Sequence, residues 1–334
     1  MTEENINDII YFDENADITL IQSKKVAIIG YGNQGRAQAL NLKDSKVDVR
    51  IGLRKNSKSH KLAQEEGFLS DPIESAVEWA DIICCLIPDQ CMAETYHESI
   101  KNNLKPGSTL LFSHGYNIHY KLIEVSKDCN VAMVAPSGPG DAVRTKYQKG
   151  SGIPNLIAVH QDATKDAFDI ALSYSKAIGG TRVCAFESTF KEETETDLFG
   201  EQVILTGTFP RMIKESFKVL LEDGYSPVVA WFVCFYEVKN IVDLFSEKGI
   251  DYMFKAVSET AEYGGQTRAD RLINDDIANE MKEILKEIKS GEFHAEWMDE
   301  SKNGLPTLKQ YRESNEVERL FNELTKVLLP KIKK

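Results

Sequence analysis

The sequence VAIIGYGNQG, residues 26–35, decides the fold of the amino-terminal half. Its four leading apolar residues predict a buried parallel strand, and GxGxxG follows at once, ahead of the helical run RAQALNLKDS. A second β-rich run, VDVRIGLR, begins at Val47, as a βαβ unit requires. This context predicts a nicotinamide dinucleotide site, in preference to a flavin site, at Gly30, Tyr31, Gly32, Asn33, Gln34 and Gly35.

The end of the second predicted strand indicates which dinucleotide binds. An NAD site usually has Asp or Glu there for the ribose hydroxyl, whereas this chain reads LRKNSKS from Leu53 to Ser59. Cations and hydroxyls suit a 2′-phosphate, so NADPH is the expected cofactor, held by Arg54, Ser57 and Ser59. The alternative is an ordinary solvated basic turn.

Further strand-like runs follow at residues 81–87, 109–112, 131–134 and 156–159, separated by helical stretches such as 73–79 and 91–102. This alternation predicts a doubly wound α/β domain, whose ligand lies at the carboxyl ends of the strands. Residues expected near the nicotinamide are therefore Pro88, Asp89, His114 and Gly140. His114 lies between a predicted strand and a glycine turn. It is predicted to have either a role in the site or a structural capping role.

Composition limits the classes of function. The 334 residues predict roughly two domains, and a formal charge of −12 gives the general surface no reason to bind nucleic acid. No apolar run is long enough to span a membrane, and MTEENINDII lacks the features of a signal peptide, so we expect a cytoplasmic protein. The six cysteines have no zinc-like spacing and are expected to be reduced and buried.

From about Phe190 the strand pattern stops and helical patterns occupy the rest of the chain. Predicted helices cover residues 195–205, 210–223, 227–248, 253–263, 275–290 and 314–329. The sequence therefore predicts a dinucleotide-binding domain at 1–187 and an all-α domain at 188–330.

The acidic stretch FKEETETDLFGEQ, residues 190–202, opens this helical half. On a helix, the spacing of four places Asp197 and Glu201 on one face, close enough to share a divalent cation. The alternative is a solvated helix start with acids in its first turn.

A third carboxylate, Glu237, lies in the run VVAWFVCFYEVKNIVDLF, residues 228–245. Because this run is apolar nearly all round, it predicts a core helix or one shared between subunits. A carboxylate there is either paired with a cation or a metal ligand. Asp197, Glu201 and Glu237 would suffice for one Mg²⁺, since substrate and water supply its other ligands.

The segments VAIIGYGNQGRAQALNL, SHGYNIHY, STFKEETETDLFGEQ and EVKNIVDL resemble, in order and spacing, those of the short-chain ketol-acid reductoisomerases. The resemblance runs over nearly the whole chain. It implies a Rossmann domain followed by a knotted helical domain, and a homodimer or higher homo-oligomer whose active site is completed across the interface. It also implies a small 2-oxo or 2-hydroxy acid substrate: enzymes of this family use NADPH and Mg²⁺ to isomerise and reduce 2-acetolactate in valine and isoleucine biosynthesis.

The resemblance also implies residue roles. Asp197 and Glu201 match metal ligands, Glu237 matches a metal-site acid on the facing helix, His114 a catalytic strand-end histidine, and Ser258 a substrate-contacting serine. Two positions depart from the family pattern, because Ser137 replaces a substrate-side lysine and Val233 replaces a glutamate one turn before Glu237.

These departures leave three functions open. The first is a working reductoisomerase, the second a paralogue that reduces another 2-oxo acid or an imine without alkyl migration, and the third a catalytically impaired NADPH-binding assembly partner. Hydride transfer is expected to be the more robust half of the reaction, because it needs only a polarised carbonyl and a well-placed nicotinamide.

Overall fold

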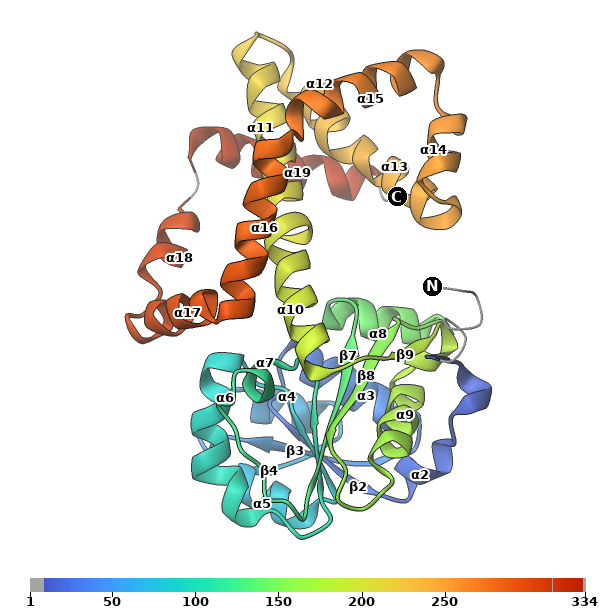
Figure 1. Ribbon diagram of the computed structural model, residues 1–334, viewed down its shortest axis with the longest axis vertical. Helices are drawn as coiled ribbons and strands as arrows, with labels where there is room; N and C mark the ends of the chain where they lie inside the picture. The colour runs from blue at the N-terminus through green and yellow to red at the C-terminus, as the bar shows by residue number, and fades with distance from the viewer. Residues whose placement is uncertain (1–8, 314, 333–334) are drawn as a thin grey trace. The chain divides into compact units, whose positions relative to one another are not determined.

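The computed structural model describes residues 9–313 and 315–332. The chain divides into two compact units, of which the first ends at Thr194 and the second begins at Glu195. The first is a sheet with helices on both faces, and the second consists of helices alone (Figure 1).

The first unit is built on a nine-stranded sheet of order β1-β9-β8-β7-β6-β5-β2-β3-β4. Its pairs are parallel except β7 with β8 and β1 with β9. The strands are β1 (Ile10–Tyr11), β2 (Lys25–Ile29), β3 (Asp48–Leu53), β4 (Leu69–Pro72), β5 (Ile82–Cys85), β6 (Thr109–Phe112), β7 (Asn130–Pro136), β8 (Asn155–Gln161) and β9 (Ala185–Glu187).

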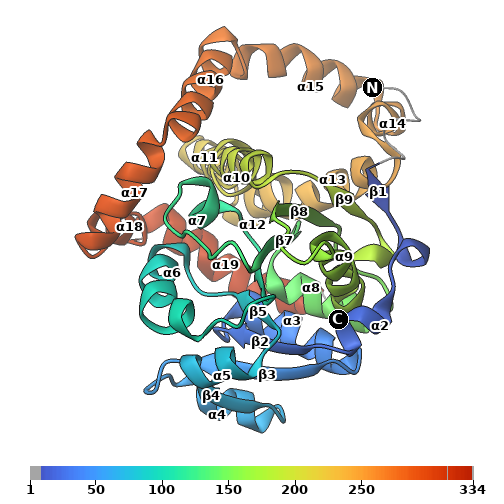
Figure 2. The same cartoon turned by 60° about the horizontal axis from the view of Figure 1, so that its bottom comes forward.

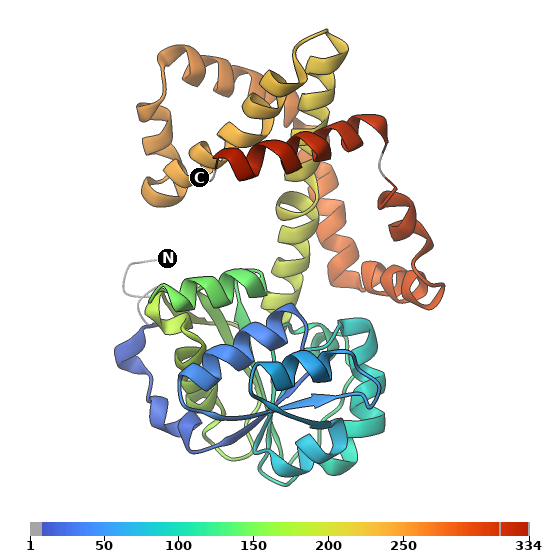
Figure 3. The same cartoon turned by 180° about the vertical axis from the view of Figure 1, so that it is seen from behind.

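Both faces of the sheet are buried. Along β2, Val26 and Ile28 belong to one core cluster while Ala27 and Ile29 belong to the other, which explains why the strand reads as a continuous apolar run. Helices α6 and α9 lie on opposite sides of the strands in Figure 2, and the blue α3 and α4 lie in front of the sheet in Figure 3. The first cluster includes residues of α2 (Ile18–Gln22), α3 (Asn33–Asp44), α4 (Ser59–Glu65) and α9 (Ala167–Ile178), and the second those of α5 (Ile73–Trp79), α6 (Asp89–Thr95), η2 (Tyr96–Ile100) and α7 (Tyr116–His119).

The expected doubly wound domain is confirmed, and its central elements lie where the sequence predicts them. The strand at 109–112 and the helix at 73–79 have the predicted bounds. The short outer strands β1, β4 and β9 were not predicted, because two to four residues carry too little periodicity. The remaining elements of this unit are η1 (Asp13–Asn15), η3 (Lys101–Asn103), α8 (Gly140–Gln148) and η4 (Gly180–Arg182).

The six cysteines are all free, as expected. Cys84, Cys85 and Cys129 are buried, whereas the other three are only partly so. Burial raises the pKa of the Cys85 thiol to about 12, which makes it an inert core side chain at neutral pH.

The second unit is all-α, as predicted, around a core formed by Phe217, Ala230, Trp231 and Phe321. No helix in the described ranges is both long and apolar enough to cross a membrane.

The helices of the second unit, counted from the one that crosses the boundary between the units, are α10 (Phe190–Gly200), η5 (Glu201–Leu205), α11 (Thr208–Glu222), α12 (Pro227–Trp231), η6 (Phe232–Tyr236), α13 (Glu237–Lys248), α14 (Ile250–Ala256), α15 (Glu259–Leu272), α16 (Asp275–Ser290), α17 (Glu292–Lys302), α18 (Pro306–Tyr311) and α19 (Glu316–Ile332).

Two expectations for this unit are corrected. The single helix predicted at 253–263 is two helices, because α14 ends at Ala256 and Ser258 caps the start of α15. The run 227–248 is helical throughout but contains the π-helical segment η6, and it is not enclosed within the chain. Glu237 is exposed there, which argues against the core-helix alternative at this position, while a helix shared between subunits stays a prediction.

Candidate active site

The glycine turn after β2 has the geometry that a dinucleotide site requires. Gly30 has φ +97°, and a Cβ on Gly35 would lie 2.4 Å from the Gly30 carbonyl oxygen. A Cβ on Gly32, in contrast, would have no heavy atom within 4 Å. The turn is therefore tightly packed at its first and third glycines and open at its second, beside the amino end of α3, where a pyrophosphate could approach the backbone.

Tyr31 is held at this turn by a partly buried hydrogen bond that the sequence did not predict. Its hydroxyl donates to Glu66 Oε2 at 2.6 Å, and Arg36 Nε donates to Glu66 Oε1 at 2.9 Å. The hydrogen bond from Arg36 lowers the pKa of the Glu66 carboxyl, while burial raises the pKa of the Tyr31 hydroxyl well above its usual value. The turn and the end of α4 are thus joined through one ionised carboxylate.

The basic turn after β3 contains the residues expected to hold the 2′-phosphate. Ser57 N donates to the Arg54 carbonyl at 2.8 Å, and Ser59 N donates to Ser57 Oγ at 3.3 Å. No role was predicted for His60, yet its ring contacts the Arg54 carbonyl at 3.2 Å and Ser70 Oγ at 2.9 Å. The Arg54 side chain is exposed at the carboxyl end of β3.

The loop after β7 packs directly on the glycine turn. A Cβ on Gly140 would lie 2.3 Å from the Asn33 carbonyl oxygen, so only glycine fits this approach. Gln34 Nε2 also donates to the Gly138 carbonyl at 2.9 Å. Gln34, Asn33 and Gly140 therefore meet at one place, as the topology predicts.

The loop after β5 lies next to the one after β6. Pro88 precedes the first residue of α6, Asp89, whose carbonyl accepts from Asn117 Nδ2 at 3.2 Å. Asn117 follows the strand-end histidine by three residues, so these two loops are joined at the same edge of the sheet.

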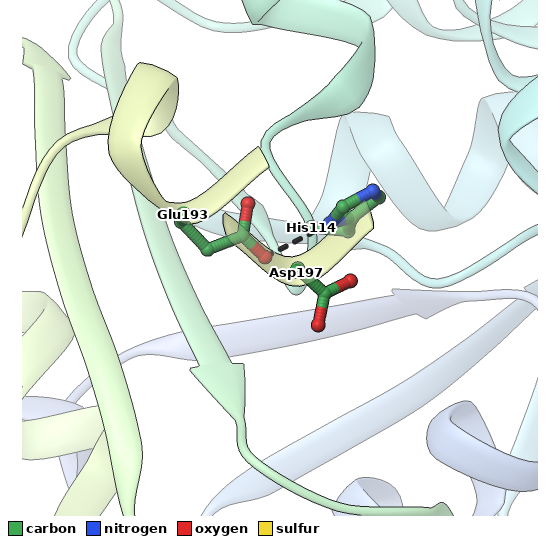
Figure 4. A group of neighbouring side chains, drawn as sticks. All are labelled: His114, Glu193 and Asp197. Atoms are coloured by element: carbon green, nitrogen blue, oxygen red, sulfur yellow. Dashed lines mark hydrogen bonds and ion pairs between the residues drawn. The ribbon is translucent and has the colours of Figure 1, made fainter. Parts of the chain in front are cut away.

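His114 is positioned by Glu193, which comes from the first turns of α10 (Figure 4). His114 Nδ1 lies 2.9 Å from Glu193 Oε1, and Gly115 N donates to Glu193 Oε2 at 2.7 Å. The Glu193 side chain is only 4% exposed. Because a carboxylate only accepts, Nδ1 of His114 carries the proton of this hydrogen bond.

Asp197 follows Glu193 by one helical turn on α10. His114, Glu193 and Asp197 each offer one ligand atom, and these three atoms lie within 4.8 Å of one another (Figure 4). Glu201 is not part of this group, and it begins the π-helical segment η5, where the helical period changes. Asp197 and Glu201 are both exposed.

Glu193 is a site residue that sequence reasoning missed. It precedes Asp197 by four residues and Glu201 by eight, so an extension of the same-face argument by one turn would have found it. Its burial could not be inferred from the acidic composition around it.

The residues predicted in the second unit lie on its surface. Val233 is 49% exposed, and Glu237 is the first residue of α13, one turn later. Ser258 Oγ accepts from Ala261 N at 3.2 Å and so caps α15. Ser137, in the first unit, is exposed, and its backbone N donates to the Pro154 carbonyl at 2.9 Å.

A doubly wound sheet with a GxGxxG turn, and a histidine held by a buried glutamate at the same sheet edge, define an NAD(P)-dependent oxidoreductase. Comparison with known families is more specific. Residues 20–184 match the family described as acetohydroxy acid isomeroreductase, NADPH-binding domain, and residues 190–328 match the ketol-acid reductoisomerase C-terminal domain. The chain belongs to the ketol-acid reductoisomerase family, and its function is that of such an enzyme.

Relatives support this assignment over nearly the full length. The ketol-acid reductoisomerase (NADP(+)) of Chloroherpeton thalassium is 47% identical over 306 residues, which cover 92% of this chain and 90% of that protein. The structure of an NADH-preferring ketol-acid reductoisomerase from an uncultured archean has a TM-score of 0.92 at 41% identity, covering 96% of this chain and 99% of that one. An NAD-binding semialdehyde dehydrogenase protein from Cupriavidus necator, at 20% identity and TM-score 0.62 over 80% of this chain and 99% of that one, shows the shared fold alone.

Proposed function

We propose that this reductoisomerase uses NADPH, binds Mg²⁺ through Asp197, Glu201 and Glu237, and carries out hydride transfer more robustly than alkyl migration. The observation that supports the site most directly is the buried Glu193, which orients His114 beside Asp197. We place the NADPH-binding domain at residues 1–187 and the metal, substrate and dimerisation domain at 188–330.

The preference for NADPH rests on the turn after β3. Arg54 is exposed there, and the Ser57 and Ser59 hydroxyls flank it on a backbone turn held by His60. A guanidinium pairs well with a phosphate, whereas no acid is present to bind a free ribose hydroxyl. A solved relative with the same fold is described as NADH-preferring, so the fold alone does not decide the coenzyme, and we assign the preference to these residues.

An Arg54→Gln variant tests this coenzyme assignment. We expect kcat/KM for NADPH to fall by roughly tenfold while that for NADH is unchanged, because a charged hydrogen bond to phosphate is lost. Lys61→Gln removes a cation from α4 that pairs with Glu65 and is the matched control. A wild-type enzyme that prefers NADH would contradict the assignment.

Three carboxylates suit Mg²⁺ because the ion prefers oxygen ligands and retains water. Glu193 itself is engaged by His114, Gly115 and Thr194, so it serves better as the partner that orients His114 than as a ligand. Asp197 offers an exposed carboxylate next to this pair. When bound, Mg²⁺ would polarise the substrate oxygens.

Because of Ser137 and Val233, we expect alkyl migration to be slower than hydride transfer. Neither side chain can replace a lysine cation or a glutamate ligand. Alkyl migration develops charge on two substrate oxygens and depends strongly on cationic stabilisation, whereas reduction requires one polarised carbonyl. We infer one firmly bound Mg²⁺ per site.

Comparing NADPH oxidation on two substrates tests this inference. We expect slow turnover of 2-acetolactate and faster turnover of the 3-hydroxy-2-oxo acid that alkyl migration would produce, with both abolished by EDTA and restored by Mg²⁺. Val233→Glu combined with Ser137→Lys should raise the acetolactate rate more than the reduction rate. Two fully occupied ions per site with fast acetolactate turnover would contradict the proposal, and reduction of simple 2-oxo acids alone would favour the non-isomerising paralogue.

The homodimer is supported by an exposed apolar face on the α12–η6–α13 helix. Val228, Val229, Val233 and Ile241 are each at least 39% exposed. Several exposed apolar side chains on one helix are typical of a helix shared between subunits. We expect Val229→Asp to yield monomers in sedimentation velocity. Val219→Asp, at a similarly exposed valine on α11, should leave the dimer intact.

NADPH binding without any turnover in the wild type would instead favour an assembly partner.

A further inference from the structure

Gln38 is a fully buried amide in the second turn of α3. Its Nε2 donates to Ser113 Oγ at 3.0 Å and to Gln34 Oε1 at 3.1 Å. Its Oε1 accepts from the Tyr174 hydroxyl, at 2.7 Å, on α9. One side chain therefore joins two helices to the end of a strand.

Each of the two partners of Gln38 Nε2 continues to a backbone carbonyl at a different loop. Ser113 Oγ donates to the Val134 carbonyl at 3.0 Å, and Gln34 Nε2 donates to the Gly138 carbonyl at 2.9 Å. Ser113 directly precedes His114, and Gly138 lies between Ser137 and the loop's close contact with the glycine turn. Through these two partners, Gln38 links the histidine loop to the loop after β7.

The polarity of this network is set by those two carbonyls. Because the Gly138 carbonyl can only accept, Gln34 must present its NH₂ there and its oxygen to Gln38. Because the Ser113 hydroxyl donates to Val134, it must accept from Gln38, whose NH₂ therefore faces Ser113 and whose oxygen faces Tyr174. All the amide orientations follow from the backbone, so neither glutamine can flip without a lost bond.

We propose that Gln38 is a positioning residue for hydride transfer, holding the His114 loop and the loop after β7 in fixed register with the dinucleotide turn. It lies behind the turn and has no exposed surface, so it acts through Ser113 and Gln34 and not by contact with ligand. Hydride transfer is sensitive to small displacements of the reacting carbons, and a fixed register between turn and loops limits such displacements. This inference rests on the proposed NADPH site.

Gln38→Met, which keeps the length of the side chain and removes both polar atoms, tests the role. We expect kcat for the 3-hydroxy-2-oxo acid to fall by at least about tenfold, with a larger primary deuterium isotope effect from 4-deuterated NADPH, because hydride transfer becomes more rate-limiting. Ser113→Ala is the milder variant if Gln38→Met folds poorly. Its effect on kcat should be smaller in the Gln38→Met background than in the wild type, because both substitutions remove the same Gln38–Ser113 hydrogen bond.

Asn130→Leu is the matched control. Asn130 is also a fully buried amide, bonded to Thr109 and Thr164, but it lies at the opposite, amino end of β7. The Asn130→Leu variant should lower the thermal midpoint about as much as Gln38→Met does, while leaving kcat and the isotope effect of the folded enzyme unchanged. Equal kinetics in both variants would overturn the role of Gln38, whereas a wild type without NADPH oxidation would overturn the proposed function instead.

Discussion

The two units carry their site residues in different ways. In the first, His114 and the glycine turn are held by hydrogen bonds within the unit, and the Glu193 side chain that orients the histidine is 4% exposed. In the second, Val233, Glu237 and Ser258 lie on exposed helical surface. The site residues of the first unit are therefore preorganised by its own fold, whereas those proposed in the second unit are not enclosed by it.

This difference locates where substitution is tolerated. A buried hydrogen-bonded group cannot be changed without leaving its partners unsatisfied, while an exposed helical position can change at little cost to folding. Val233 is at such an exposed position, so a departure from the family pattern there should cost the fold little. Four substitutions, ordered by expected effect, test the contrast.

Asp197→Asn is expected to have the largest effect. If the exposed carboxylate beside His114 is a Mg²⁺ ligand, as we propose, its replacement should lower kcat for acetolactate by at least about 100-fold with little change in thermal midpoint. Steady-state assays across Mg²⁺ concentrations measure both changes. Glu192→Gln is the control, because Glu192 is an acid on the same helix that accepts a hydrogen bond from Ser188. An equal loss of kcat in both variants would argue against Asp197 as a metal ligand.

Glu193→Gln should affect both activity and folding. The neutral amide cannot accept from His114 Nδ1 and Gly115 N together, so we expect roughly 10- to 100-fold lower kcat and about 1–3 kcal/mol lower free energy of unfolding. Denaturant titration and kinetics measure the two quantities. Unchanged stability would show that the first unit is less dependent on internal bonds than its geometry implies.

Gly140→Ala tests the packing of the β7 loop on the glycine turn. The added Cβ would lie 2.3 Å from a backbone oxygen, so the loop must move, and we expect KM for NADPH to rise by about tenfold. Gly138→Ala is the control, because its Cβ would meet only the Ile153 side chain at 3.5 Å. Isothermal titration with NADPH distinguishes them, and equal affinities would argue against this contact.

Ser258→Ala should have the smallest effect and separates capping from substrate contact. Loss of the N-cap in Ser258→Ala should lower the free energy of unfolding by about 1 kcal/mol. Asn274→Ala, which removes the N-cap of α16, should lower it by a similar amount. Only Ser258→Ala is expected to raise KM for the substrate, by a few-fold. If both variants behave alike, Ser258 is a capping residue alone.

Much of the first unit could be predicted because its signals are local. A continuous apolar run followed by GxGxxG specifies strand, turn and helix, and the chain order of strands then places Pro88, His114 and Gly140 at one sheet edge. The glycines confirm this physically, since Gly30 has positive φ and Gly35 and Gly140 have no room for a side chain. The expected spacing of Asp197 and Glu201 was less informative, because η5 changes the helical period at Glu201.

The sequence by itself determined the fold class, the dinucleotide turn and the acidic helix, because each is a matter of residue type and spacing along the chain. Ser137 and Val233 are departures only by comparison with the family pattern that the sequence resembles. Only the tertiary structure decided that Glu193 orients His114, that Glu237 is exposed, and that Gln38 joins two loops. The reason is that burial and hydrogen-bond partners depend on segments far apart in sequence: Glu193 and His114 are 79 residues apart, and Gln38 and Tyr174 are 136 apart.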